Sequence, residues 1–227
     1  MNIQTIDFER RTVVDDVFER LRSDIVSLKL VPGTKLSEVE VAKQMDVSRQ
    51  PVREAFIRLS NLKLLKIRPQ KATVVRKISE REILNSRFIR TAIELEVVRK
   101  ACKVAGQPYE TEFAQNLARQ LEAVNDLDAG RFHNLDYEFH GLICAVANCD
   151  FAYTTIAESK AHVDRLCMLS LSTKEGLQEI YDDHVKIHDR LKNKDEEGLV
   201  ALTRLHLTRL DKTLAAARLA HEDYFED

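Results

Sequence analysis

Hydrophobic positions recur at helical spacing through the last two thirds of the chain. One such series begins at Ile89 and continues with Ile93, Val97 and Ala101. No proline follows Pro108. Residues three or four positions apart share one face of a helix, and proline interrupts helices, so this part is predicted to be entirely helical. The expected helices lie near residues 79–104, 109–126, 129–148, 150–170, 173–193 and 195–220.

The first eighty residues show shorter periodic segments separated by turn residues. The expected helices here lie near residues 14–28, 37–45 and 48–60. Two short β-prone runs follow, Leu65–Arg68 and Thr73–Arg76, joined by Pro69–Ala72. Three helices followed by a basic hairpin are typical of a winged helix-turn-helix. We therefore predict a mainly α protein, with a winged helix-turn-helix at residues 1–78 and an all-helical bundle at residues 79–227.

Charge is distributed unevenly between these two parts. The whole chain carries a formal net charge of -2, which by itself argues against a nucleic-acid partner. Residues 41–77, however, contain ten Lys and Arg but only two acidic residues, Asp46 and Glu54. Beyond residue 80 the acidic residues outnumber the basic ones. Charge asymmetry between domains makes the basic part a candidate for binding nucleic acid.

The third predicted helix has an apolar face and a basic face. Val52, Ala55, Phe56 and Leu59 fall at the spacing of a buried stripe. Recognition helices place their first residues against base edges, where Arg pairs with guanine and Gln with adenine, and their exposed amides hold phosphate. A basic helix alone is more often a solvated surface, but here it lies between a second helix and a basic hairpin. The residues expected to contact DNA are Ser48, Arg49, Gln50, Arg53, Arg58 and, at the tip of the hairpin, Lys71.

All seven histidines lie beyond residue 132, and some share helix faces with acidic residues. Asp136 and His140 are four positions apart, as are His184 and His188, while His206 lies in the last predicted helix. A carboxylate and several imidazoles converging inside a bundle are typical ligands of a divalent metal. Spacing alone would pair Asp136 and His140 with His184 and His188. An isolated helical histidine is more often a surface or core residue than a ligand.

The remaining sequence features restrict the cellular setting. The first residues carry alternating charges and do not form a signal peptide. No segment approaches the roughly 18 consecutive apolar residues of a membrane helix, so no membrane partner is expected. The four cysteines form no Cys-x-x-Cys pair and are interpreted as buried thiols in a reducing compartment. These features predict a cytoplasmic protein.

One long run of the first part resembles the signature of the GntR family of bacterial transcription regulators. The matching segments are Pro32–Gly33, Leu36–Glu38, Ala42, Val47–Arg49 and Pro51–Ala55. The resemblance implies that Arg49 and Arg53 contact DNA and that Gln50 tunes sequence preference. The family often has Gly where this chain has Leu28, Lys63 and Ala72, and some members have a DNA-contacting Arg near Val39.

The helical part resembles the FCD effector domain of the FadR-type branch of that family. The resemblance implies a metal held by Asp136, His140, His184 and His206, which makes His188 the weaker candidate. Zn²⁺ is the first expectation by availability, with Ni²⁺ or Mn²⁺ as alternatives. The resemblance further implies that Arg90 faces a cavity and binds an acidic effector; Arg165 is a weaker candidate for the same role.

These features predict a DNA-binding transcription regulator, and the family resemblance favours a repressor. It is expected to be a homodimer on a palindromic double-stranded operator, modulated by a small organic or sugar acid. The alternative is a metal-dependent hydrolase or lyase with an accessory basic domain. Against that alternative, the sequence offers no evident general base beyond the metal ligands and no nucleophile motif.

Overall fold

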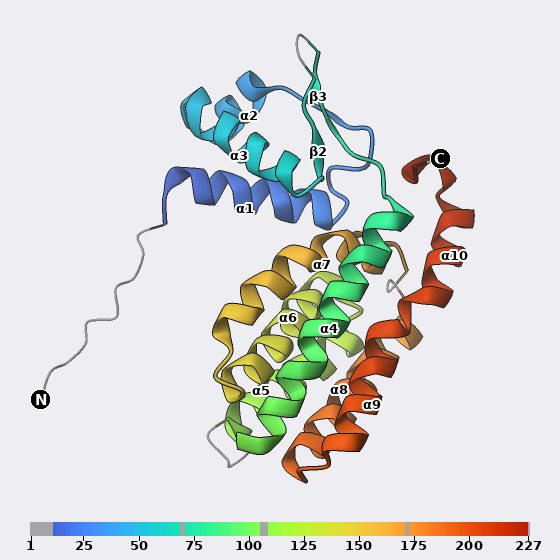
Figure 1. The fold of residues 1–227 in the computed structure, drawn as a ribbon. Coiled ribbons are helices and arrows are strands. Elements are labelled where there is room, and N and C mark those ends of the chain that lie inside the picture. Colours follow the sequence, from blue (N-terminus) through green and yellow to red (C-terminus); the bar gives the residue numbers. More distant parts are fainter. Residues whose placement is uncertain (1–10, 69–70, 105–108, 171–172, 227) are drawn as a thin grey trace, which may run out of the picture. The chain divides into compact units, whose positions relative to one another are not determined.

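A computed structural model describes residues 11–226 except residues 69–70, 105–108 and 171–172 (Figure 1). The chain forms two compact units, Met1–Arg76 and Lys77–Asp227. Both consist mainly of helices, which confirms the predicted fold class. Among the described residues, no helix is long and apolar enough to cross a membrane.

The first unit combines three helices with a small sheet. Its elements are α1 (Val13–Val26), β1 (Lys35–Leu36), α2 (Glu38–Gln44), α3 (Arg49–Asn61), β2 (Leu65–Lys66) and β3 (Thr73–Val75). The strands are antiparallel in the order β1-β3-β2. The sequence predicted β2 and β3 but not β1, because two residues are too few to show an alternating pattern. The predicted turn residues Pro69 and Gln70 lie outside the described residues.

The apolar stripe of α3 forms the centre of this unit. Val52, Ala55, Phe56 and Leu59 are at most 1% exposed, which confirms the predicted face. Helix α3 packs against α1, whose own buried face includes Phe18. The charged face of α3 is consequently turned away from the core and toward solvent.

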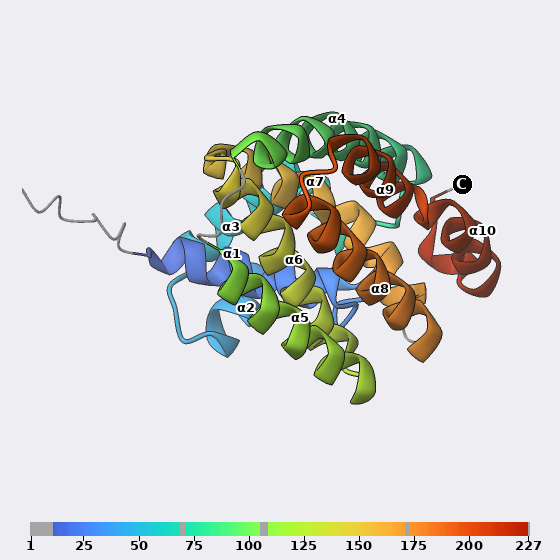
Figure 2. The same ribbon diagram turned by 90° about the horizontal axis from the view of Figure 1, so that it is seen from below.

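The second unit is a helical bundle. Its elements are α4 (Glu80–Val104), α5 (Glu110–Asn125), α6 (Ala129–Val146), α7 (Asp150–Ser170), α8 (Lys174–Lys192), α9 (Glu196–Thr208), α10 (Leu210–Ala220) and the 3₁₀ turn η1 (Glu222–Tyr224). Helix α6 lies among α4, α5, α7 and α8 and contacts all four (Figure 2). Side chains of α6 therefore reach the interior of the bundle from the middle of its helices.

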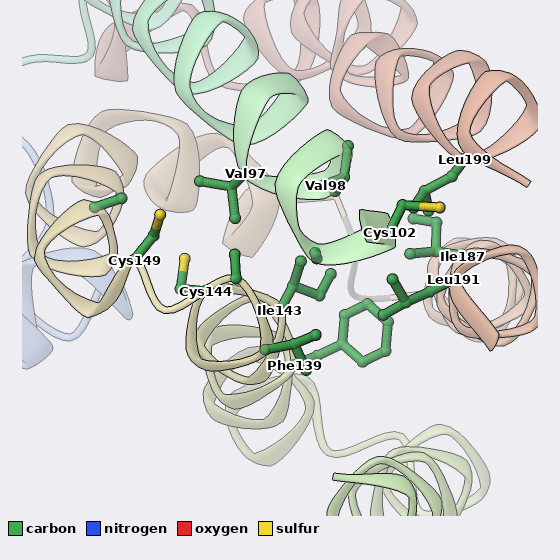
Figure 3. Packing of buried hydrophobic residues seen from close by; sticks show 14 of the residues in the cluster. Val97, Val98, Cys102, Phe139, Ile143, Cys144, Cys149, Ile187, Leu191 and Leu199 are labelled. Atoms are coloured by element: carbon green, nitrogen blue, oxygen red, sulfur yellow. The ribbon is translucent and has the colours of Figure 1, made fainter. Parts of the chain in front are cut away.

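The main core of the bundle surrounds the second half of α6. Phe139 and Ile143 of α6 meet Val98 of α4 and Ile187 and Leu191 of α8 (Figure 3). Each of these five side chains is at most 5% exposed. This packing fixes α4, α6 and α8 relative to one another, and the same helices supply the polar side chains described below.

The last predicted helix is interrupted in the structure. The sequence predicted one helix over residues 195–220, whereas α9 ends at Thr208 and α10 begins at Leu210. At the junction, Arg209 forms ion pairs with Glu179 and Asp183 of α8. Neither a glycine nor a proline marks this site, so local sequence could not reveal the break.

Candidate functional site

Four side chains from three helices converge inside the bundle. Asp136 and His140 extend from α6, His184 from α8 and His206 from α9. All four are buried, and each offers one ligand atom within 4.8 Å of the others. Donor atoms bound to one tetrahedral Zn²⁺ at about 2.1 Å lie about 3.4 Å apart, so these side chains would have to move closer together to bind it.

Each histidine ring is oriented by an oxygen acceptor on its Nδ1 side. Because these oxygens only accept, the Nδ1 atoms donate and the Nε2 atoms keep their lone pairs. The pairs are His140 with Glu94 at 2.7 Å, His184 with Gln120 at 2.8 Å and His206 with Asp183 at 3.4 Å. The Nε2 atoms of His140 and His184 have no hydrogen-bond partner among the described residues. This is the outer-shell pattern that fixes metal-binding imidazoles.

The protonation states of the cluster suit a cation. Burial, with the neighbouring His206, holds the pKa of His184 well below its ordinary value, and burial also lowers the pKa of His206. Burial by itself would raise the pKa of Asp136, but Lys160 and the nearby histidines hold it well below its usual value. The shifts of His184 and His206 favour the neutral imidazole and that of Asp136 favours the carboxylate, which are the ligand forms that a divalent metal requires.

Lys160 of α7 is a buried cation that the sequence analysis missed. Its Nζ atom lies 2.5 Å from Oδ2 of Asp136 and 3.0 Å from Oδ1 of Asp164. Burial opposes the charged form, but these two carboxylates raise the pKa of Lys160 above its ordinary value. From sequence, Lys160 and Asp164 resemble an ordinary surface pair four residues apart, so only the structure reveals them. Asp136 thus directs Oδ2 to Lys160 and Oδ1 toward the Nε2 atoms of His140 and His184.

A pocket adjoins the cluster, and three cationic residues are among those that line it. Asp136 and His206 contribute to its wall, so it borders the candidate metal position directly. It contains about 610 Å³ of space outside protein atoms, including its opening to solvent. The cationic lining residues are Arg90, Lys160 and Arg209, and the apolar ones include Phe132, Val163, Leu177 and Ile180. A few polar groups in a mostly apolar concavity are typical of a small-molecule site.

The two arginines predicted to bind an effector occupy different places. Arg90 lines the pocket, is 5% exposed and donates from Nε to Glu94 at 2.8 Å. Glu94 in turn accepts from His140, so Arg90 connects the pocket to the histidine cluster. Arg165 is fully buried and is not among the pocket-lining residues of the described part of the chain.

His188, the alternative metal ligand suggested by spacing alone, lies away from the cluster. Its ring stacks on Phe113 with centroids 4.8 Å apart, and its Nε2 lies 3.5 Å from Glu110. The resemblance to the FCD domain, rather than the spacing, therefore selected the set of residues that the structure brings together.

In the first unit, the N-terminal half of α3 exposes a polar face. The Arg49 side chain is 68% exposed and lies 3.5 Å from Glu38. Gln50 donates to Glu54 at 2.8 Å, and Arg53 is exposed. Arg49, Gln50 and Arg53 are thus at the surface, where Arg49 lies near the partly buried Glu38 and Gln50 bonds to the exposed Glu54.

The other predicted DNA contacts have different surroundings. Ser48 immediately precedes α3, is exposed, and its hydroxyl does not cap the helix in the described structure. Lys71 is exposed at the hairpin. Arg58 pairs with Asp15 of α1 at 2.8 Å and lies 4.0 Å from the centre of the Phe18 ring. Arg58 thus links α3 to α1, and any contact with DNA would compete with that pair.

A winged-helix unit with an exposed basic helix, joined to a helical bundle with a ligand pocket, defines the class of two-part DNA-binding regulators. Comparison with known proteins identifies the family. Residues 13–75 match the family model described as "Bacterial regulatory proteins, gntR family", and residues 86–209 match the FCD domain. The chain belongs to the gntR family of bacterial regulatory proteins, in the branch that carries an FCD domain.

Two relatives and one solved structure agree with this assignment. The chain is 34% identical to the HTH-type transcriptional repressor RspR of Escherichia coli K12, over 100% of both chains. It is 28% identical to the gluconate operon transcriptional repressor of Bacillus subtilis, over 74% of this chain and 68% of that one. The solved structure of E. coli McbR/YncC has the same fold, with a TM-score of 0.79 and 21% identity over 93% of this chain and 100% of that one.

The family assignment settles the general function. The protein is a transcription regulator and not an enzyme, and the hydrolase or lyase alternative has no support. Members of this family bind DNA and, through the FCD domain, a small-molecule effector.

Proposed function

We propose that this protein is a repressor whose operator affinity is set by a small carboxylate bound next to a divalent metal in the bundle. The observation that carries the proposal is the shared wall of the pocket. Asp136 and His206 belong both to that wall and to the cluster of donor atoms, and three cations line the same cavity. A carboxylate in this pocket would meet the metal and the cations together.

On the DNA side, Arg49, Gln50 and Arg53 read the major groove from the exposed start of α3. Arg suits guanine and Gln suits adenine, and the helix N-terminus with Ser48 receives a phosphate. One short helix contacts too few base pairs for an operator to be unique. A homodimer on two half-sites related by two-fold symmetry supplies the missing specificity.

On the metal side, Asp136, His140, His184 and His206 hold the ion, with Zn²⁺ as the first choice and Ni²⁺ or Mn²⁺ as alternatives. The fit rests on the orphaned Nε2 atoms of His140 and His184 and on the oxygen partner of every Nδ1. When bound, the metal supplies a Lewis-acidic position for a carboxylate oxygen. Arg90, Lys160 and Arg209 then orient the anion and contribute to its charge balance.

The class of effector follows from this lining. The anionic group of the effector would face Arg90, Lys160 and Arg209, and its remaining atoms would pack against Phe132, Leu177 and Ile180. A small organic or sugar acid has this combination of a carboxylate and a compact body. The similarity to a repressor named for a gluconate operon supports the sugar-acid option.

An effector changes operator binding only if it binds one conformation of the dimer better than the other. For a repressor, the effector favours the conformation with low DNA affinity, so that its arrival releases the operator. The coupling expected for such a system is about 5- to 150-fold in affinity.

The DNA-reading part is tested by substituting Arg49. An operator would first be selected from random duplex DNA with the wild-type protein. Arg49→Ala is expected to lower operator affinity by about 5- to 150-fold, corresponding to about 1–3 kcal/mol, and to relax base preference at one position. Fluorescence anisotropy at fixed salt measures both affinities. Arg20→Ala, which removes an exposed charge from α1, is the matched control and should have little effect. An equal loss on operator and random DNA would reduce Arg49 to a phosphate contact.

A further inference from the structure

The C-terminal residues are bound to the segment that enters the bundle. The Ile78 amide donates to the carbonyl of Tyr224 at 2.7 Å, and the Glu226 amide donates to the carbonyl of Ile78 at 2.9 Å. Together they form a short parallel bridge between Ile78 and Phe225. We call residues 221–226 the C-terminal strap.

Side chains reinforce this bridge. Ile78 is 1% exposed and Phe225 is 2% exposed. Arg218 of α10 also pairs with Glu80, the first residue of α4, at 2.9 Å. Around the bridge lies a distinct apolar cluster, whose members are Ile78, Ile83, Val163, Leu166, Leu214, Ala217 and Phe225.

The position of Ile78 in the chain gives the strap its importance. The DNA-binding unit ends at Arg76, and α4 begins at Glu80. Residues 77–79 are therefore the first residues of the second unit and join the DNA-binding unit to α4, and the strap is bound to the middle one of the three. Opening the bridge would release both backbone bonds of Ile78 at once.

The apolar cluster around Ile78 and Phe225 also contributes a side chain to the pocket. Val163 lines the pocket and belongs to the cluster around Phe225. Arg209 also lines the pocket and directly precedes α10, which contributes Leu214 and Ala217 to that cluster. A ligand that moves Val163 therefore acts on the cluster that contains Phe225, and one that moves Arg209 acts on the start of the helix that leads to the strap.

We infer that α10 and the C-terminal strap transmit the state of the pocket to residues 77–79, and so control how firmly the DNA-binding unit is held. The inference rests on the proposed function, in which the DNA-binding units of the two protomers of a homodimer bind one palindrome. A firmly held connection gives the second half-site a high effective concentration, whereas a loose one lowers it without altering any DNA contact. The strap therefore affects binding to a palindrome and leaves binding to a single half-site unchanged.

The test uses Phe225→Ala in the full-length protein. Leu219→Ala is the matched control, because Leu219 lies on α10 just before the strap but is 88% exposed. Hydrogen exchange should show faster exchange at the amides of Ile78 and Glu226 in Phe225→Ala alone. Affinity for the selected palindrome should fall about tenfold, while affinity for one half-site stays within twofold. If Phe225→Ala proves poorly folded by circular dichroism, a chain ending at His221 replaces it, since that chain lacks the Tyr224 acceptor and the Glu226 donor.

The inference would be overturned if a variant whose Ile78 and Glu226 amides exchange freely still bound the palindrome with wild-type affinity. A separate measurement adds Zn²⁺ to the wild type and follows the same amides together with bound zinc. Slower exchange at Ile78 and Glu226 on zinc binding supports transmission, and unchanged exchange with zinc bound contradicts it. If zinc does not bind, the metal part of the proposed function fails, while the comparison of palindrome and half-site still decides whether the strap controls the connection.

Discussion

At the residue scale, the arrangement around the histidines shows what sequence can and cannot supply. The spacing in the sequence already pointed to Asp136, His140 and His184, and the resemblance to the FCD domain replaced His188 with His206. The acceptors Glu94 and Gln120 lie on other helices, α4 and α5, so no local pattern relates them to the histidines they orient. Lys160 was missed for a similar reason, because lysine is rarely buried and its carboxylate partners become apparent only after folding.

The metal ligands can be tested one ring at a time. His184→Ala is expected to abolish stoichiometric zinc, because it removes one donor and leaves Gln120 without its imidazole partner. His188→Ala is the matched control on the same helix and should keep its zinc, since that ring packs on Phe113. Elemental analysis of dialysed protein measures both, with circular dichroism to check folding. If His188→Ala lost its zinc and His184→Ala kept it, the metal ligand on α8 would be His188 and not His184.

Asp15 gives a prediction about pH in the first unit. Its carboxylate accepts from Thr12 in the capping box of α1 and pairs with Arg58, and these bonds hold its pKa below the ordinary 3.8. A carboxyl group with a lowered pKa in the folded state stabilises that state above its unfolded pKa, and the stabilisation is lost as pH falls through the folded value. Asp15→Asn should therefore lower the melting temperature at pH 7, and the difference from wild type should shrink below about pH 4.

Asp16→Asn serves as the control for Asp15→Asn. It removes the same charge from the same first turn of α1, where any effect of the helix dipole would be shared. Equal and pH-independent shifts in the two variants would show that neither the capping box nor the Arg58 pair contributes.

At the element scale, the helices of the bundle were predictable because each buries a periodic apolar face. What escaped prediction depends on contacts from other elements. The end of α9 coincides with the pairing of Arg209 to α8, and β1 exists only because Lys35 and Leu36 pair with β3. The departures from the family's glycines were visible in sequence, and two of them fall at left-handed residues, Leu28 at φ 59° and Lys63 at φ 57°.

The left-handed conformation of Lys63 predicts that a glycine there is stabilising. Lys63 follows the C-terminal end of α3, where the next amide, that of Leu64, donates to Leu59 in the manner of a helix C-terminal motif. A side chain in this conformation costs about 1–2 kcal/mol, and the greater freedom of glycine in the unfolded chain offsets part of that gain. Lys63→Gly should raise the free energy of unfolding by about 0.5 kcal/mol, measured by urea denaturation.

A glycine introduced within the helix should instead lower the free energy of unfolding. Asn61→Gly places glycine at the last residue of α3, where it loses helix propensity without relieving any strain. If both variants were destabilised, the left-handed residue would not be a source of strain in this unit.

At the scale of the whole molecule, the near-zero net charge conceals two different surfaces. The basic residues between 41 and 77 lie in the unit that carries α3 and the hairpin, where phosphate contacts are needed. The acidic excess belongs to the bundle, which supplies Asp136 to the histidine cluster and the carboxylates Glu94 and Asp183 that face its rings. Reading charge by unit rather than by chain is what made the DNA-binding function predictable from sequence.

The most direct test of the account measures operator affinity as the pocket is filled. Chelator-treated protein would be titrated onto the selected operator alone, then with Zn²⁺, and then with Zn²⁺ plus acetate, citrate or D-gluconate in turn. The account predicts that at least one carboxylate weakens wild-type binding fivefold or more, only in the presence of Zn²⁺, and that His140→Ala abolishes this response. Wild-type protein with one bound zinc per chain, whose operator affinity changes less than twofold with every carboxylate, would contradict it.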